Sequence, residues 1–301
     1  FLSTVDLLLN SLLLVISALL IIGGDLTTGT YAAVNVIIGT ALQPIRSLAQ
    51  IVEVLQNSRL SFNTANELLQ TDPDEPHGNA EADLQSPVLL LENVSFRYSI
   101  YGETIHNNLR LRIASKNSKP ITVRLDGGTG VGKTTLLNLI LGLLTPTEGR
   151  ILIYGVDVHQ ISKTDRNRIV QYVDRSPFIV NESVINNALL GSEAKPADLH
   201  RCLQALSLDD EPLFREQSHR VLQDASSLST GQAVMVALVR AVLMQPKLLL
   251  LDEALTSLPE SQHLPILLGL RSLGINVLLV QHGTSKAMES VPTVAMDAIQ
   301  S

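Results

Sequence analysis

Apolar residues are distributed so unevenly that they divide the chain into two parts. Residues 7–24 carry no charge and little polarity, which approaches the roughly 20 residues that a helix needs to cross a bilayer. Residues 26–45 form a second uncharged stretch, in which Asn35, Thr40 and Gln43 are dispersed as if one face met water or other helices. Both stretches are predicted to span a membrane, and a pair of buried helices in a soluble protein is the alternative.

Charged residues around these stretches predict their orientation. Arg46 and Arg59 follow the second stretch, whereas the turn between the two carries only Asp25. Because Lys and Arg are enriched on the cytoplasmic side, both chain ends are predicted to be cytoplasmic. A polar helical pattern continues to about residue 70, where prolines, a glycine and acids indicate a linker. The predicted domains are the C-terminal part of a membrane domain at 1–70, a linker at 71–87 and a second domain at 88–301.

Beyond residue 87, short apolar runs alternate with helical patterns. The runs are residues 88–91, 121–125, 248–251 and 276–280, and the pattern LLNLILGLL at 136–144 is helical. Such alternation predicts an α/β domain with a largely parallel sheet.

Composition narrows the function classes. The mean hydropathy of +0.24 with 3% aromatic residues agrees with membrane segments. A net charge of -7 and the lack of a clustered basic face argue against nucleic acid as a partner. Cys202, the single cysteine, cannot form an intramolecular disulfide and has no metal-ligand spacing, so an idle thiol is predicted.

A glycine-rich run follows the apolar run at 121–125 and leads into the helical pattern. Its sequence, DGGTGVGKTT, has the spacing of a phosphate-binding loop, in which glycines let backbone N–H groups wrap phosphates at a helix N-terminus. Lys133 is expected to bind the β and γ phosphates of ATP, and the Thr134 hydroxyl to ligate Mg²⁺. The residues expected to contact ATP here are Gly127, Gly128, Thr129, Gly130, Val131, Gly132, Lys133, Thr134 and Thr135.

An acid pair ends the apolar run LLLLDE. This arrangement predicts Asp252 beside the Mg²⁺ shell and Glu253 beside an attacking water. Taken alone, the pair could equally be an ordinary strand end. The phosphate loop in the same chain favours the catalytic interpretation.

The run LSTGQ distinguishes this chain from other families with a phosphate loop. With the loop and the acid pair, it makes the chain resemble an ATP-binding cassette (ABC) protein. The resemblance implies that this motif and the N-terminus of the following helix contact the γ-phosphate of ATP held by an opposite subunit. The resemblance therefore also implies a dimer, formed with a second exporter subunit that is either identical to this one or different from it. The residues of the motif are Leu228, Ser229, Thr230, Gly231 and Gln232.

Two further residues match the resemblance. Tyr98, in the run VSFRY, has the place of the aromatic residue that stacks on adenine, although a sheet-face tyrosine is a competing interpretation. His282, at the end of NVLLVQH, matches the histidine that contacts the γ-phosphate. With Glu253 as general base, His282 completes the expected catalytic pair.

The first part of the chain also has a family resemblance. GDLTTGTYAAVNVIIGTALQPI is similar to the last transmembrane hairpin of bacterial type I secretion and peptide exporters, with Thr40 where an arginine often stands. This similarity favours a polypeptide cargo without excluding lipids or drugs. It implies a multi-pass protein of the plasma (inner) membrane, in contact with lipid, whose nucleotide-binding domain is cytoplasmic.

Two departures from the family pattern fall at the catalytic face. Arg175 replaces a glutamine that ligates Mg²⁺, and a guanidinium has five donors and no acceptor, so it would repel the cation and attract phosphate. Pro259 replaces an aspartate that communicates across the dimer. The alternatives are that Asp174 or Gln171 takes the vacant role, or that Arg175 points to solvent.

The predicted fold is an α/β phosphate-loop ATPase domain with an ABC helical subdomain, preceded by two transmembrane helices. The predicted function is ATP-driven export by a dimer. A non-hydrolytic regulatory subunit of a heterodimer is the second hypothesis, favoured by the two departures. A soluble cassette ATPase acting on nucleic acid is a third, disfavoured by the charge and by the apolar stretches.

Overall fold

The computed structural model divides into two compact units, Phe1–Pro73 and Asp74–Ser301. Each unit is considered by itself. The residues that the structure describes are 2–24, 27, 29–33, 36–37, 40, 51, 83, 85–99, 102–115, 119–128, 130–216, 227–281 and 291–299.

The first unit begins with helix α1, Leu2–Ile22, which covers most of the predicted span at 7–24. Its leucine-rich sequence favours a helix, and the helix ends where Gly24 adopts a φ of 84°. Side chains such as Leu12, Leu14 and Leu19 are exposed. None of the helices in the described part of the chain combines the length and hydropathy of a membrane crossing. The second predicted span and the helical pattern after it lie largely outside the described residues.

The second unit contains two sheets. One is antiparallel with the order β2-β1-β4-β5, and the other is parallel with the order β6-β7-β8-β3-β9. The parallel sheet agrees with the sequence prediction, whereas the antiparallel sheet was not predicted. The strands are β1 (Leu89–Phe96), β2 (His106–Ile113), β3 (Thr122–Asp126), β4 (Glu148–Ile153), β5 (Val156–Asp157), β6 (Val170–Asp174), β7 (Leu248–Asp252), β8 (Asn276–Val280) and β9 (Thr293–Ala295).

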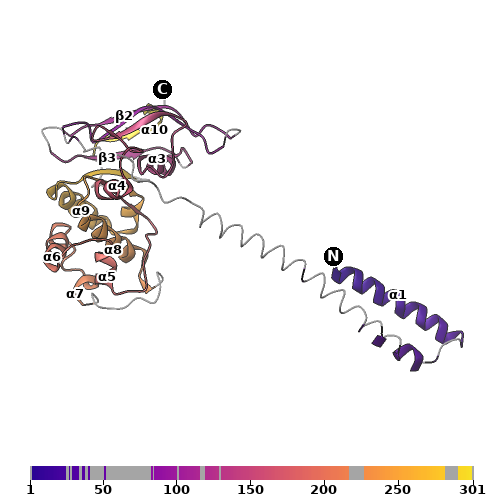
Figure 1. Ribbon diagram of the computed structural model, residues 1–301. Helices are drawn as coiled ribbons and strands as arrows, with labels where there is room; N and C mark the ends of the chain where they lie inside the picture. The colour runs from indigo at the N-terminus through magenta and orange to yellow at the C-terminus, as the bar shows by residue number, and fades with distance from the viewer. Residues whose placement is uncertain are drawn as a thin grey trace. The chain divides into compact units, whose positions relative to one another are not determined.

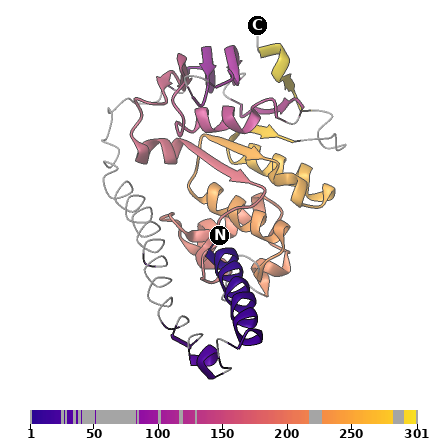
Figure 2. The ribbon, with the colours of Figure 1, turned by 90° about the vertical axis from the view of Figure 1, so that its right-hand side faces the viewer.

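Most helices of this unit lie on the same side of the parallel sheet. Figure 1 shows α5, α6 and α7 at the end opposite to β2 and α10, with α8 and α9 between, and Figure 2 shows the same order from the side. The helices are α3 (Lys133–Ile140), α4 (Lys163–Ile169), α5 (Val184–Leu189), α6 (Pro196–Ala205), α7 (Pro212–Arg215), α8 (Thr230–Leu243), α9 (Glu260–Ser272) and α10 (Met296–Ile299), with a 3₁₀ turn η2 (Ala254–Ser257) after β7.

The parallel sheet separates two apolar cores. Leu248 and Leu250 of β7 pack with α3 in one core, whereas Leu249 and Leu251 pack with α8 in the other. Because successive side chains of a strand point to opposite faces, a strand buried on both faces reads as a continuous run of leucines. The sheet therefore holds α3 and α8 on opposite sides.

Helix α3 is shorter than the apolar pattern at 136–144 predicted. It ends at Ile140, and Gly142 takes a φ of 65° and donates its N–H to the carbonyl of Leu139 at 3.0 Å. A glycine in the left-handed conformation is a common helix terminator. The leucines after Gly142 continue the apolar pattern but not the helix.

A buried amide joins the two sheets at the amino ends of the parallel strands. Asn276 Oδ1 accepts the N–H of Ile121 at 2.9 Å, and its Nδ2 donates to the hydroxyl of Tyr154 at 2.8 Å and to the carbonyl of Lys247 at 3.0 Å. Tyr154 directly follows β4 of the antiparallel sheet. One side chain thus connects β8, the residues preceding β3 and β7, and the second sheet.

Candidate active site

The glycine-rich loop lies between β3 and α3, as the sequence predicts. Gly132 caps α3 with a φ of 89°, and Lys133 is the first residue of the helix. Lys133 is buried, and its ammonium donates to the carbonyls of Gly127 and Gly128 at 2.6 and 2.7 Å. The cation is therefore held over the first turn of the loop. Thr129, the remaining predicted loop residue, lies outside the described residues.

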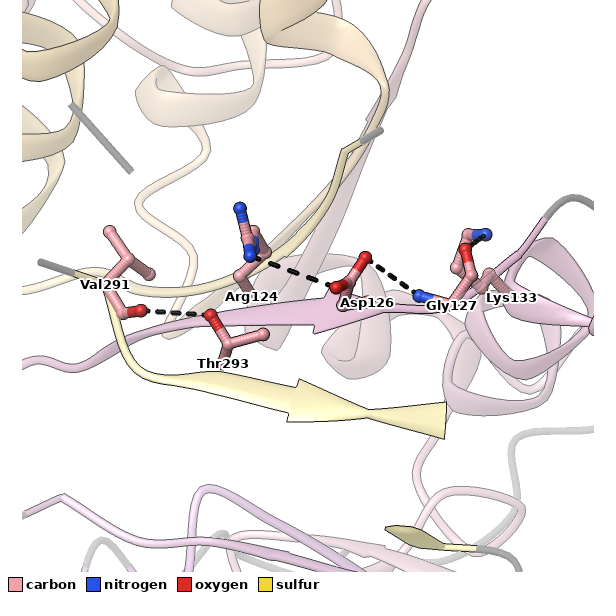
Figure 3. Close-up of polar contacts among 6 residues, drawn as sticks. All are labelled: Arg124, Asp126, Gly127, Lys133, Val291 and Thr293. Carbon is pink, nitrogen blue, oxygen red and sulfur yellow. Dashed lines mark hydrogen bonds and ion pairs between the residues drawn. The ribbon is translucent and has the colours of Figure 1, made fainter. Parts of the chain in front are cut away.

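An acid that the sequence analysis did not single out fixes the start of the loop. Asp126 accepts the N–H of Gly127 at 3.0 Å through Oδ1, and its Oδ2 lies 4.0 Å from the Arg124 guanidinium. Figure 3 shows Asp126 at the end of β3, between Arg124 and Gly127, with Lys133 next to Gly127. The sequence signal that could have identified Asp126 is its position directly before the first glycine of the loop.

Asp252, at the end of β7, meets the loop helix. The Thr134 hydroxyl donates to Asp252 Oδ2 at 3.0 Å, and the Tyr172 hydroxyl donates to the same oxygen at 3.3 Å. Burial raises the pKa of Asp252, the bonds from Thr134 and Tyr172 lower it, and the charges of Glu253 and Asp174 raise it. Burial, together with the charges of Asp252 and Asp174, also raises the pKa of Tyr172. Tyr172 therefore belongs to the site. The sequence does not indicate this, because Tyr172 lies within an apolar strand.

Glu253 has an unusual backbone conformation. Its φ is 53°, and its N–H donates to the carbonyl of Val280 at 2.8 Å. Such a φ is uncommon outside glycine, and it turns the chain sharply away from β7. The end of β7 is therefore tied to the end of β8, two residues before His282. The side chain of His282 lies outside the described residues.

The LSTGQ motif caps α8. Ser229 Oγ accepts the N–H of Gln232 at 3.2 Å, and Gln232 Oε1 accepts the N–H of Ser229 at 3.0 Å, which is a reciprocal capping box. Leu228 is buried, and Gly231 packs so closely that an added Cβ would lie 2.6 Å from the Ser257 carbonyl oxygen. The motif therefore contacts η2, the turn that follows Glu253.

Tyr98 lies beside the loop. Tyr98 is 63% exposed, its hydroxyl is 3.1 Å from Thr135 Oγ1, and its ring and that of Phe96 form a T-shaped pair with centroids 4.9 Å apart. An exposed aromatic face next to a phosphate loop is available for stacking.

The structure also places the two departures from the family pattern. Arg175 is exposed directly after β6 and makes no hydrogen bond or ion pair within the described ranges. Gln171 donates its amide to the Asn167 carbonyl and shares a strand face with Val173, away from the loop. Asp174, in contrast, pairs in register with Asp252. Of the two replacements considered, only Asp174 lies at the site.

Pro259, the second departure, is the N-cap of α9 and supplies no side-chain hydrogen bond there. A proline has no carboxylate and no N–H, so it can neither cap the helix nor bond a partner across a dimer.

The donor set fits a magnesium nucleotide. Thr134 and Asp252 supply one hydroxyl and one carboxylate close enough to share a cation, and Lys133 supplies a cation for phosphates. No group of three or more His, Cys, Asp or Glu residues suited to a metal occurs in the part of the chain that the structure describes. Mg²⁺ typically takes one or two protein ligands and completes its shell with phosphate oxygens and water, as this set requires.

Comparisons with known proteins agree with this geometry. Residues 112–256 match the ABC transporter family model. The chain is 30% identical over 289 residues to the lactococcin transport/processing ATP-binding protein LcnC-like of Lactococcus lactis subsp. lactis, covering 95% of this chain and 40% of that protein. It is 27% identical over 288 residues to the alpha-hemolysin translocation ATP-binding protein HlyB of Proteus vulgaris, covering 94% and 40%. The chain thus spans about two fifths of the length of these relatives.

A solved structure has the same fold. A bacterial Atm1-family ABC exporter with ATP bound superposes with a TM-score of 0.68 at 21% sequence identity, covering 97% of this chain and 52% of that one.

Proposed function

We propose that this chain, whose residues 112–256 are an ABC transporter domain, is the ATP-binding and ATP-hydrolysing part of an exporter of peptides or proteins. The observation behind the proposal is the contact between the phosphate loop and the acid pair. Lys133 lies over the loop, and Thr134 bonds Asp252 at 3.0 Å. Binding of Mg²⁺ and ATP needs these three groups in one place.

The acid at position 253 has the role of general base. Asp252 and Thr134 would hold Mg²⁺ and Lys133 would bind the β and γ phosphates, and the carboxylate of Glu253, next to Asp252 in the chain, would accept a proton from water. Glu253 follows β7 directly, and its backbone is bonded to the end of β8. His282, two residues beyond Val280, is proposed to approach the γ-phosphate from that strand.

A dimer completes the site. The Ser229 O–H and the first N–H groups of α8 lie at the N-terminus of this helix, where the helix dipole is positive. We propose that this end, with residues 228–232, binds the γ-phosphate held by a second exporter subunit. Closure of the dimer then drives the membrane domain between inward- and outward-facing states.

The cargo is proposed from the relatives. Their names state transport or processing of lactococcin and translocation of alpha-hemolysin, and a peptide or protein cargo is proposed on that basis. The first unit is proposed to be the end of a membrane domain, at 1–70 with a linker at 71–87, preceding the nucleotide-binding domain at 88–301. The exposed apolar side chains of α1 support this, since large exposed apolar surfaces mark contact with lipid or protein. The plasma membrane is the proposed location.

The experiment that tests ATP binding replaces the loop lysine. Lys133→Ala should abolish binding of a fluorescent ATP analogue, because it removes the cation that faces the phosphates. Lys195→Ala, at the exposed start of α6, is the matched control and should bind normally. Equal affinity of the Lys133→Ala variant and the unaltered chain would contradict the assignment.

A non-hydrolytic regulatory subunit of a heterodimer is the second candidate, favoured by Arg175 and Pro259. Arg175 is exposed, so solvent screening reduces its repulsion of Mg²⁺ to about 1 kcal/mol or less. Arg175→Gln should therefore raise the ATPase rate at limiting Mg²⁺ by up to about fivefold. A Mg²⁺ titration of both proteins measures this. Hydrolysis that is absent from both, while binding is intact, would favour the regulatory subunit.

A further inference from the structure

A buried histidine lies directly behind the phosphate loop. His106, the first residue of β2, has 0% of its surface exposed, and its Nε2 is 3.1 Å from the carbonyl oxygen of Gly132. A carbonyl only accepts, so Nε2 carries the hydrogen and donates. Nδ1 has no hydrogen-bond partner among the described residues. The ring is therefore in its neutral form with one hydrogen bond, and that bond goes to the loop.

The imidazole also shapes the loop by contact. A Cβ added at Gly132 would lie 2.6 Å from His106 Cε1 and 2.8 Å from a methyl group of Ile105. The carbonyl that His106 holds also accepts the N–H of Leu136 at 2.9 Å, the first bond of helix α3. One carbonyl thus joins the histidine, the last loop glycine and the start of the helix that carries Lys133.

The connection between β1 and β2 is tied to the loop at both of its ends. Tyr98, just after β1, lies 3.1 Å from Thr135 through its hydroxyl, and His106 holds Gly132 where β2 begins. Both ties are partly buried, but Tyr98 in the first is exposed, whereas His106 in the second is fully buried. Since water reaches the imidazole less easily than the Tyr98 hydroxyl, the second tie is the stronger constraint.

We propose that His106 is a positioning residue for nucleotide binding, whose neutral imidazole holds the Gly132 peptide so that the loop amides and Lys133 face the phosphates. The inference rests on the proposed function, because it concerns the same loop. His106 touches no phosphate itself and acts only through Gly132.

Protonation of His106 should weaken this arrangement. Burial lowers the pKa of His106 below its ordinary 6.5, and the bond to Gly132 opposes this less strongly. The described titratable groups of the connection and the loop are Arg97, Tyr98, Glu103, Asp126 and Lys133, and none is among the causes of the shift. A proton on Nδ1 would therefore be a buried N–H without an acceptor.

The test measures affinity for a fluorescent ATP analogue, without Mg²⁺, on the full chain. His106→Leu removes the donor and should weaken binding about three- to tenfold, the range of one hydrogen bond. His106→Gln keeps an N–H donor at the same reach and should stay within about twofold of the unaltered chain. His263→Leu is the matched control for His106→Leu, because His263 is also buried and bonds a carbonyl, that of Leu258, at 3.1 Å. It should lose stability without losing affinity.

Two readouts separate positioning from simple structural support. In His106→Leu, amide exchange at residues 131–136 should be faster while the rest of the domain exchanges as before. The ratio of the dissociation constants of the unaltered chain and His106→Gln should rise as the pH falls through the pKa of His106, which burial lowers from its ordinary value. The titration of the nucleotide cancels in this ratio.

The outcomes distinguish the two levels of inference. Failure of the unaltered chain to bind nucleotide overturns the proposed function, and this inference with it. Binding that is lost in Lys133→Ala but unchanged in a folded His106→Leu, with unchanged exchange at residues 131–136, overturns only the role of His106. Where His106→Leu does not fold, a ratio of dissociation constants that stays flat with pH likewise overturns that role.

Discussion

Gly231, the glycine of LSTGQ, has a packing role that a single methyl group tests. In Gly231→Ala the new Cβ would lie 2.6 Å from the carbonyl oxygen of Ser257 and 3.7 Å from a methyl group of Leu258. The first distance is far inside van der Waals contact, and the opposing atom is backbone, so it cannot rotate away. Either α8 or η2 must shift by about half an ångström.

The magnitude follows from two opposing effects. Overpacking of a dense interior typically costs about 1–3 kcal/mol. Replacing glycine with alanine in a helix returns up to about 1 kcal/mol, and less in a first turn such as this one. The net loss should be about 1–2 kcal/mol, which lowers the melting temperature of a domain of this size by roughly 2–8 °C. Because η2 follows Glu253, the ATPase rate should fall as well.

Thermal unfolding without nucleotide is the assay, since no nucleotide then joins residues 228–232 to a second subunit. Thr230→Ala is the matched control, because Thr230 is exposed on the same helical turn and its loss should change stability by at most about 0.5 kcal/mol. A Gly231→Ala variant that melts at or above the temperature of Thr230→Ala would refute the packing argument. The glycine would then be required only by a partner.

Three further predictions concern other parts of the domain. Glu253→Gln should slow hydrolysis about 10²–10⁴-fold and accumulate an ATP-bound dimer, visible by size-exclusion chromatography; a variant that stays monomeric with ATP would contradict the general base. Asn187→Ala should lower the free energy of unfolding in urea by about 3 kcal/mol, because its buried amide bonds both backbone groups of Val180; a loss no greater than that of Asn186→Ala would refute this. Burial raises the pKa of Cys202 to about 12, so a thiol reagent at pH 8 should label it only after unfolding, and rapid native labelling would disprove its burial.

Sequence reasoning predicted the strands and helices correctly where the pattern lies in contiguous residues. The leucine run of β7 and the glycine spacing before Lys133 each lie within ten residues, so their pattern predicts both the strand or helix and a chemistry for the residues at its end. The parallel sheet followed from the same short runs. The contact between Thr134 and Asp252 joins two such motifs that the family resemblance already associates.

The residues that sequence reasoning missed depend on pairing between distant segments. Tyr172 reaches Asp252 only because β6 and β7 are neighbours in register, and His106 reaches Gly132 only because β2 begins behind the loop. Neither has a local motif. The antiparallel sheet was missed because the pairing of β4 with β1 and of β5 with β4 follows tertiary context rather than hydrophobic period.

The amide of Asn276 has a mechanical consequence for the domain. It fastens the two sheets to each other at the amino ends of the parallel strands, whereas the phosphate loop and the acid pair stand at the carboxyl ends. A rotation of one sheet against the other about this fastened edge moves the amino ends least and the carboxyl ends most. The strand length of about 17 Å then acts as a lever arm, so a rotation of a few degrees would displace the loop by about 1 Å relative to the opposite sheet, a movement that the bonds of His106 to Gly132 and of Tyr98 to Thr135 oppose.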